Sequence, residues 1–124
     1  MSKRVLLVGL QSSSADFSKW PGLTKEKLEQ SLAAVEAQLR DDGFEAAWCL
    51  TDDGATAETV LEKALVDFQP DIVSIGAGVR VDPDLLLLFE AFVNIAHRVS
   101  PDARFAFGTS PMDTIAAVHR AAGP

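Results

Sequence analysis

Hydroxyl groups, glycines and one arginine follow three apolar runs of the sequence, and these residues are the best suited to hold a ligand. Hydroxyls, exposed backbone amides and a guanidinium all donate hydrogen bonds, so together they suit a small anion. We therefore predict a ligand-binding site composed of Gln11, Ser12, Ser13, Gly76, Gly78, Arg80, Thr109 and Ser110. Each loop also has a purely structural interpretation, because glycines after a strand permit tight turns and serines hydrogen-bond loop backbone.

Arg80 is the expected main contact for the anion, with Ser12 and Thr109 as secondary donors. In the absence of a ligand, the nearest partners in sequence are Asp82 and Asp84. An exposed ion pair of that kind contributes at most about 1 kcal/mol. A charge-assisted hydrogen bond to a bound carboxylate or phosphate contributes about 1.5–3 kcal/mol, which favours the ligand as the partner of Arg80.

Acidic residues also gather in the loops and helix starts near this predicted site, where Lys19 and Arg80 are the only cations. We expect most of them to cap helices and to interact with helix dipoles. Their charge disfavours a dinucleotide, and leaves open a monoanion at Arg80 or a Mg²⁺-like cation near Asp82. No carboxylate spacing specifies a metal site, so we predict none. The acidic residues are Asp16, Asp52, Asp53, Asp82, Asp84 and Asp113.

Candidate nucleophiles and bases are poorly placed for catalysis. Cys49 lies inside an apolar run, which is typical of a buried small hydrophobic residue, and a single cysteine excludes an internal disulfide and CxxC motifs. His97 and His119 lie toward the ends of helical patterns, remote from the serine-rich loop. We therefore identify no catalytic constellation and assign no cofactor.

Four β-rich runs alternate with helical patterns, as in stacked βαβ units. The strands are expected at residues 5–8, 45–51, 71–75 and 104–107. The helices are expected to begin at Thr24, Thr56, Asp82 and Ser110, where capping residues precede apolar periodicity. The third of these helices is expected to end near residue 99.

This pattern predicts one α/β domain over residues 1–124, a three-layer sandwich with a four-stranded parallel sheet in the order 2-1-3-4. The first and last helices would cover one face of the sheet, and the second and third helices the other. Ligands of open α/β sheets bind beyond the carboxyl ends of the strands, at the point where crossovers diverge. In this order that point lies between the first and third strands, beside the predicted site.

Residues 69–76 and 104–109, with Ser100-Pro101 before the second segment, resemble the layout of receiver and flavodoxin-like domains. The resemblance implies a flavodoxin/Rossmann-like fold. A receiver would carry its phosphoacceptor aspartate at Gly76, so phosphoryl reception is not expected. The flavodoxin phosphate loop contains a glycine, whereas residues 11–16 keep only the hydroxyls. The chain also resembles small uncharacterised bacterial single-domain proteins that carry an IGAGVR segment before a leucine-rich helix, which implies a fold and no activity.

The third predicted helix has an apolar face wider than one sheet contact requires, and Leu87 points into its polar side. One interpretation is a helix packed between the sheet and its neighbours. The other is a homodimer interface with Leu87 and Val93 at or near the contact.

Composition narrows the classes of partner. The net charge of −7 disfavours a nucleic-acid or anionic-membrane surface. The first apolar run is too short for a signal sequence, so we expect a cytoplasmic protein. The leading hypothesis is a non-catalytic binding or interaction domain acting as a homodimer. The alternative is a small enzyme or sensor acting on an anionic metabolite at the C-terminal edge of the sheet.

Overall fold

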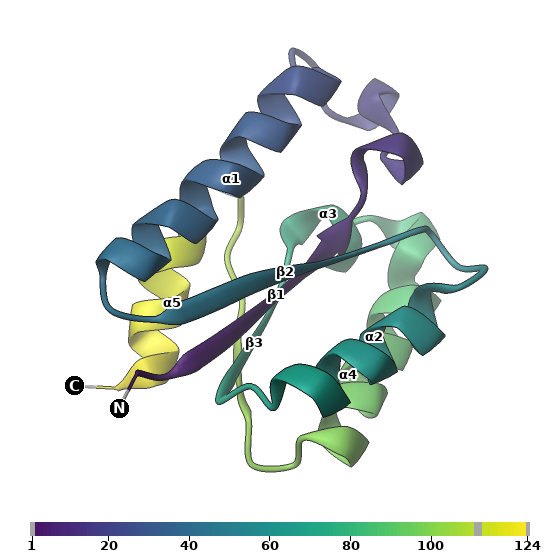
Figure 1. Cartoon of the computed structure of the whole chain (residues 1–124). Coiled ribbons are helices and arrows are strands. Elements are labelled where there is room, and N and C mark those ends of the chain that lie inside the picture. Colours follow the sequence, from purple (N-terminus) through teal and green to yellow (C-terminus); the bar gives the residue numbers. More distant parts are fainter. Residues whose placement is uncertain (1, 111–112, 124) are drawn as a thin grey trace.

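The computed structural model describes residues 2–110 and 113–123 and contains one four-stranded parallel sheet (Figure 1). The strands are β1 (Arg4–Leu10), β2 (Glu45–Thr51), β3 (Ile72–Ile75) and β4 (Arg104–Ala106), in the order β2-β1-β3-β4. The predicted fold class and strand order are confirmed.

The helices lie on both faces of the sheet: α1 and α5 cover one face, and α2 and α4 cover the other (Figure 1). A short helix, α3, follows β3 directly, and the described connections contain three single 3₁₀ turns. The helices are α1 (Lys25–Asp41), α2 (Ala57–Phe68), α3 (Ala77–Arg80), α4 (Leu86–Val99) and α5 (Thr114–Ala122), and the turns are η1 (Ser12–Ser14), η2 (Phe17–Lys19) and η3 (Pro83–Leu85).

The alternation of side chains along β1 builds two separate hydrophobic cores. Val5 and Leu7 face α1 and α5, whereas Leu6 and Val8 face α2 and α4. All four are essentially buried, because helices cover the sheet on both sides. The central strand therefore has no polar face, which explains why its sequence is continuously apolar.

Of the predicted capping residues Thr24 and Thr56, the structure confirms the first and not the second. The Thr24 side chain accepts a hydrogen bond from the Lys27 backbone N–H (3.1 Å) and caps α1, as predicted. The Thr56 side chain caps nothing; instead Asp52 accepts hydrogen bonds from the Thr56 backbone and hydroxyl. The Asp52 carboxylate accepts from both Thr56 donors, so the Thr56 hydroxyl acts as a donor and does not cap the helix.

The segment between β3 and α4 differs from the prediction. Residues 77–80, expected in a loop, form α3, and the helix expected from Asp82 begins only at Leu86. Asp82 does act as a cap, but of η3: it accepts a hydrogen bond from the Asp84 backbone, and Pro83 follows as the first residue of the turn. The predicted start at Ser110-Pro111 includes Pro111, which lies outside the described residues; α5 begins at Thr114.

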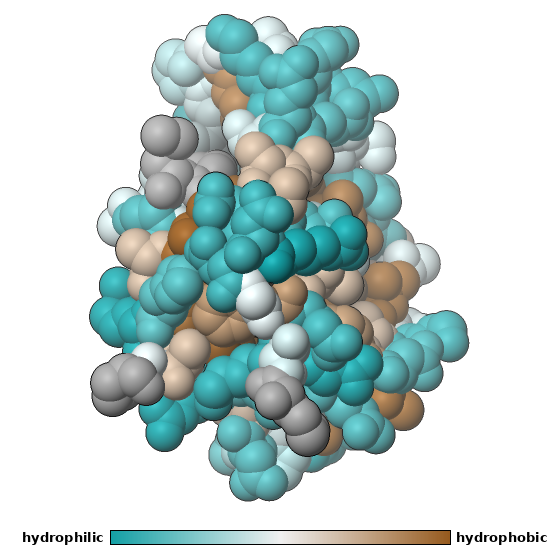
Figure 2. Space-filling model, turned by 60° about the vertical axis from the view of Figure 1, so that its left-hand side comes forward, coloured by the Kyte–Doolittle hydropathy of each residue, from teal (hydrophilic) through white to brown (hydrophobic). Residues whose placement is uncertain are grey.

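The face that carries α1 and α5 is mostly hydrophilic, with hydrophobic residues visible in small patches between charged and polar ones (Figure 2). Elsewhere, Leu87 is 77% exposed at the start of α4, whereas Val93 is partly buried against the core beside α2. No helix in the described part of the chain is long and apolar enough to cross a membrane.

Candidate functional site

A cavity of about 360 Å³ lies at the carboxyl ends of β1 and β3, where the crossovers of the sheet diverge. Gly9 and Leu10 line it from the end of β1, and residues 76–79 line it from β3 and α3. The sequence predicted a ligand-binding edge at this position, since parallel sheets bind ligands where the strand order reverses.

The segment from η1 to α1 forms one side of the cavity, and hydrogen bonds within the segment hold its shape. Asp16 caps η2 by accepting from the Ser18 backbone (3.0 Å) and hydroxyl. The Ser12 hydroxyl donates to Glu29 (2.7 Å) and so ties η1 to α1. These bonds place Lys19 and Trp20 beside the cavity.

The walls of the cavity are largely apolar. Leu28 and Leu32 contribute from α1, and Trp48 contributes from β2. The Trp48 indole N–H donates to the Leu32 carbonyl (2.8 Å), which fixes the ring against the helix. A predominantly apolar lining with a few polar groups is typical of small-molecule sites.

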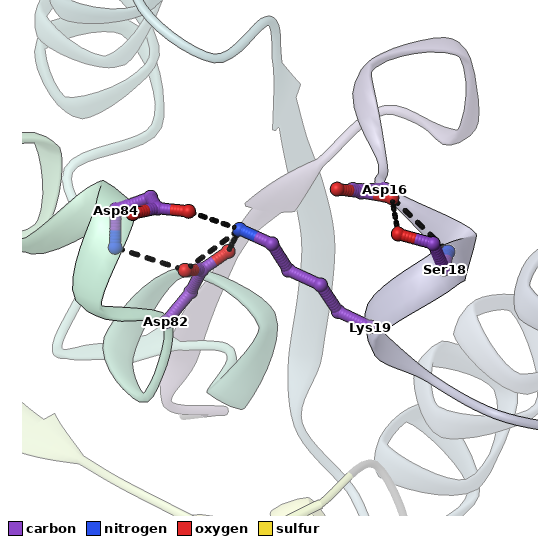
Figure 3. A network of polar contacts seen from close by, with 5 residues as sticks. All are labelled: Asp16, Ser18, Lys19, Asp82 and Asp84. Carbon is purple, nitrogen blue, oxygen red and sulfur yellow. Dashed lines mark hydrogen bonds and ion pairs between the residues drawn. The ribbon is translucent and has the colours of Figure 1, made fainter.

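An ion bridge connects η2 with the start of η3 (Figure 3). Its residues line the cavity, and Lys19 and Asp84 are exposed to solvent, so the bridge marks the mouth of the cavity. The Lys19 ammonium lies 2.8 Å from a carboxylate oxygen of Asp82 and 2.7 Å from one of Asp84. Hydrogen bonds to both carboxylates raise the pKa of Lys19, and the bond from Lys19 lowers the pKa of Asp82. Lys19 and Asp82 are therefore charged at neutral pH.

The carboxylate of Asp16 lies near this bridge, on the η2 side of the cavity (Figure 3). Hydrogen bonds from Ser18 lower its pKa, with a smaller contribution from the charge of Lys19. Among the described residues, Asp16 has no ion-pair partner within contact distance. It keeps its charge at neutral pH and leaves oxygen lone pairs available.

Only part of the predicted site lines the cavity. Gly76 and Gly78 do so, and Ser14 joins them from the serine-rich loop. Gln11, Ser12 and Ser13 lie in the same loop without lining it. The Gln11 side chain donates to the Ser14 hydroxyl (3.1 Å), the Ser12 hydroxyl is taken by Glu29, and Ser13 is exposed.

Arg80 does not pair with Asp82 or Asp84, contrary to the expectation for the unliganded chain; Lys19 occupies both carboxylates instead. The Arg80 guanidinium donates to the Gly108 carbonyl and lies 5.8 Å from the centre of the Phe107 ring. Its Nε is buried without a hydrogen-bond partner among the described residues. Arg80 therefore braces the end of β4 and does not line the cavity.

Thr109 and Ser110 belong to a second cluster, organised by Asp113. The Asp113 carboxylate accepts from the Thr109 backbone (2.8 Å), the Thr109 hydroxyl (2.6 Å) and the Ser110 backbone (3.1 Å). These hydrogen bonds lower the pKa of Asp113 to about 2. The carboxylate thus takes the place that an anion would occupy on the predicted donors of this loop.

Lys19 and the α1 leucines are not among the site residues predicted from the sequence. The Asp16-x-Ser18 spacing was an available signal, because an aspartate that caps a turn two residues on folds its chain locally. No comparable signal in the sequence shows that Leu28 and Leu32 line a cavity.

The histidines, the cysteine and possible metal ligands of the described residues can be placed relative to this cavity. No three His, Cys, Asp or Glu side chains in the described part of the chain are arranged to hold a metal ion. Cys49, His97 and His119 do not line the cavity. Burial raises the pKa of the Cys49 thiol to about 11, so this thiol is protonated and a poor nucleophile at neutral pH.

Comparisons with known proteins leave the cavity as the main guide to function. No protein-family model matches this chain, and no curated protein is significantly similar to it in sequence.

Proposed function

We propose that this protein is a non-catalytic binding domain that holds a small molecule in the cavity at the carboxyl ends of β1 and β3. The cavity itself is the observation that carries the proposal. Its volume of about 360 Å³ falls within the roughly 300–1,000 Å³ of known small-molecule pockets. It also lies where doubly wound sheets bind their ligands.

The side chains around the cavity favour binding over catalysis. The titratable groups that line it are four aspartates and Lys19, and Lys19 is held between two of those aspartates. Ser14 is the lining serine, and its described side-chain partner is the Gln11 amide, which cannot act as a base. A nucleophile beside a general base is therefore not formed from these groups.

The alternative function, an enzyme or sensor for an anionic metabolite, has weaker support. Four carboxylates face one ammonium at the cavity, so an anion would meet net repulsion. Arg80, the expected anion contact, is turned toward Gly108 and Phe107. The donors of Thr109 and Ser110 are occupied by Asp113.

A cavity-filling variant tests the binding proposal. A Cβ added at Gly78 meets no atom within 4 Å, so Gly78→Phe should fold and place its ring at the cavity. Gly54→Phe is the matched control, because Gly54 has equal space and does not line the cavity. In a small-molecule fragment screen by saturation-transfer NMR, we expect fragments that bind the wild type and Gly54→Phe but not Gly78→Phe. The absence of any such fragment would overturn the proposal.

Self-association is proposed as part of the same function, and exposed apolar side chains support it. Leu86 and Leu87 are 57% and 77% exposed at the start of α4, and nearby Val81 is 47% exposed. Adjacent exposed apolar side chains of this size favour a contact surface. The short strand β4 lies at one edge of the sheet, and its outer side pairs with no other strand of the described residues. Such an open edge is compatible with a homodimer.

A further inference from the structure

Charge distinguishes the cavity from an ordinary apolar pocket. The charged side chains that line it are Asp16, Asp53, Asp82, Asp84 and Lys19, with a formal charge of −3. Asp53 has no ion pair among the described residues, and neither has Asp16. A positively charged ligand would therefore gain electrostatic energy on entering, and a negatively charged one would lose it.

Asp82 fixes one of these negative charges at the mouth of the cavity. Its side chain is only 8% exposed, and both of its oxygens lie within 3.0 Å of the Lys19 ammonium. A buried carboxylate requires a cation or several hydrogen-bond donors close by. The protein thus already holds one alkylammonium group at this point, which shows that the local geometry suits that group.

Asp16 offers a second carboxylate to a cation on the other side of the mouth. It accepts from Ser18 through Oδ1, and its carboxylate lies close to the Lys19 bridge (Figure 3). Figure 3 shows Asp16 and the Asp82–Asp84 pair on opposite sides of the Lys19 side chain. An ammonium between them would have oxygen acceptors from both loops.

The inner walls of the cavity are apolar and suit the apolar part of a ligand. Its walls are formed by Trp20, Leu28, Leu32, Trp48, Val79 and Leu85. Such walls favour an aromatic or branched aliphatic body, and indole rings also attract cations through their faces. The apolar walls and the acidic mouth together specify an amphipathic cation.

We propose that the cavity binds a small molecule with an apolar body and a protonated amine. The apolar body packs against the two tryptophans and the α1 leucines. The amine lies at the mouth, where it donates hydrogen bonds to Asp16 and to the Asp84 oxygen that Lys19 does not contact. The assignment rests on the proposed binding function and adds the chemical class of its ligand.

Three probes with one phenyl body test the ligand class: 2-phenylethylamine, 2-phenylethanol and 3-phenylpropionate. Titration followed by ¹H–¹⁵N NMR should give 2-phenylethylamine an affinity at least about tenfold higher than that of 2-phenylethanol, as expected for a charge-assisted contact. The carboxylate should bind most weakly. The preference for the amine should decrease with added salt, because the mouth of the cavity is open to solvent.

Two substitutions at the mouth should move this preference in opposite directions. Asp16→Asn should lower the ratio of amine to alcohol affinity by about tenfold. Lys19→Met removes the competing ammonium and should raise that ratio. Asp41→Asn is the charge-matched control, because Asp41 is exposed at the end of α1 and does not line the cavity. It should leave the ratio unchanged.

The possible failures separate the ligand class from the binding function. If the alcohol or the carboxylate binds as well as the amine, and Gly78→Phe abolishes that binding, the ligand class is wrong and the binding function stands. The same holds if other fragments bind this cavity but none of the three probes does. If no probe or fragment binding depends on Gly78, both proposals are wrong.

Discussion

Asp113 holds the turn after β4 together through hydrogen bonds that require a charged carboxylate. It accepts from both the backbone and the hydroxyl of Thr109, and from the Ser110 backbone. Gly108 allows the approach, because a Cβ at that position would collide with the Asp113 carboxylate. Each bond favours the ionised form, so the pKa of Asp113 falls from 3.8 to about 2.

We predict that Asp113→Ala destabilises the protein at neutral pH and that this difference disappears in acid. A folded pKa below the unfolded value stabilises the fold above pH 3.8, and the contribution is lost as the pH falls toward 2. Urea unfolding between pH 7 and pH 2 measures the difference. Asp102→Ala, at an exposed carboxylate, should change stability little throughout. A constant gap between wild type and Asp113→Ala would contradict this assignment.

Arg80 and Lys19 show what sequence cannot settle at the scale of single residues. Both were recognised as the cations near the strand ends, and the nearest acids in sequence to Arg80 are Asp82 and Asp84. In the structure, both aspartates instead form ion pairs with Lys19, which is more than sixty positions away in the chain. The choice depends on how η2 folds over the sheet, which local sequence rules do not encode.

Helix α1 begins with a cap whose energetic contribution can be isolated. The Thr24 hydroxyl accepts from the Lys27 backbone N–H, one of the unpaired donors of the first turn. We predict that Thr24→Ala lowers the free energy of unfolding by about 1 kcal/mol. Thr59→Ala, on the exposed surface within α2, should instead stabilise the protein by a few tenths of a kcal/mol, since alanine is the better helix former. Chemical denaturation of both variants measures the contrast.

The ion bridge of Lys19 connects η2 with η3, and we predict that it restrains the segment beside the cavity. Lys19→Met should increase amide hydrogen exchange several-fold in residues 12–20, which have few other long-range polar contacts. Lys63→Met is the control, because Lys63 pairs with Asp67 inside α2 and joins no two elements. Unchanged exchange in residues 12–20 would show that apolar packing and the Ser12–Glu29 bond hold this segment without the bridge.

The sequence predicts a helix or strand well where its hydrophobic pattern and its capping residues indicate the same bounds. The bounds of β2 and the cap of α1 follow directly from the sequence, because Thr24 precedes an apolar periodicity that ends at Gly43 with φ of 97°. Helix α3 was missed since residues 77–80 contain glycine and form a single turn. A helix this short depends on its tertiary position more than on propensity.

At the scale of the molecule, the topology was predictable because four strands with helical crossovers leave few arrangements. The continuous apolar run of β1 placed it in the middle of the sheet, and the polar positions of β2 placed it at the edge. The position of the cavity followed from the strand order. The acidic mouth and the apolar inner walls of the cavity could not be predicted from the strand order, because they depend on the side-chain directions of α1 and η2.

The exposed start of α4 leads to a prediction about the whole molecule in solution. Leu87 is 77% exposed, and neighbouring Leu86 and Val81 add apolar surface. Val93, the other residue predicted at the contact, is partly buried against the core and is available to a partner only in part. We expect a homodimer, with twice the 13.3 kDa of the chain, whose contact centres on Leu86 and Leu87.

Light scattering at high micromolar concentration checks the mass, and Leu87→Glu should give the monomer, because a buried unpaired charge opposes association. Val66→Glu is the matched control, since Val66 is 56% exposed on α2, away from Leu86 and Leu87 in the chain, and should leave the dimer intact. A wild-type mass of 13.3 kDa would overturn the prediction. A dimer unaffected by Leu87→Glu would move the interface elsewhere, with the open edge of β4 as the next surface to test.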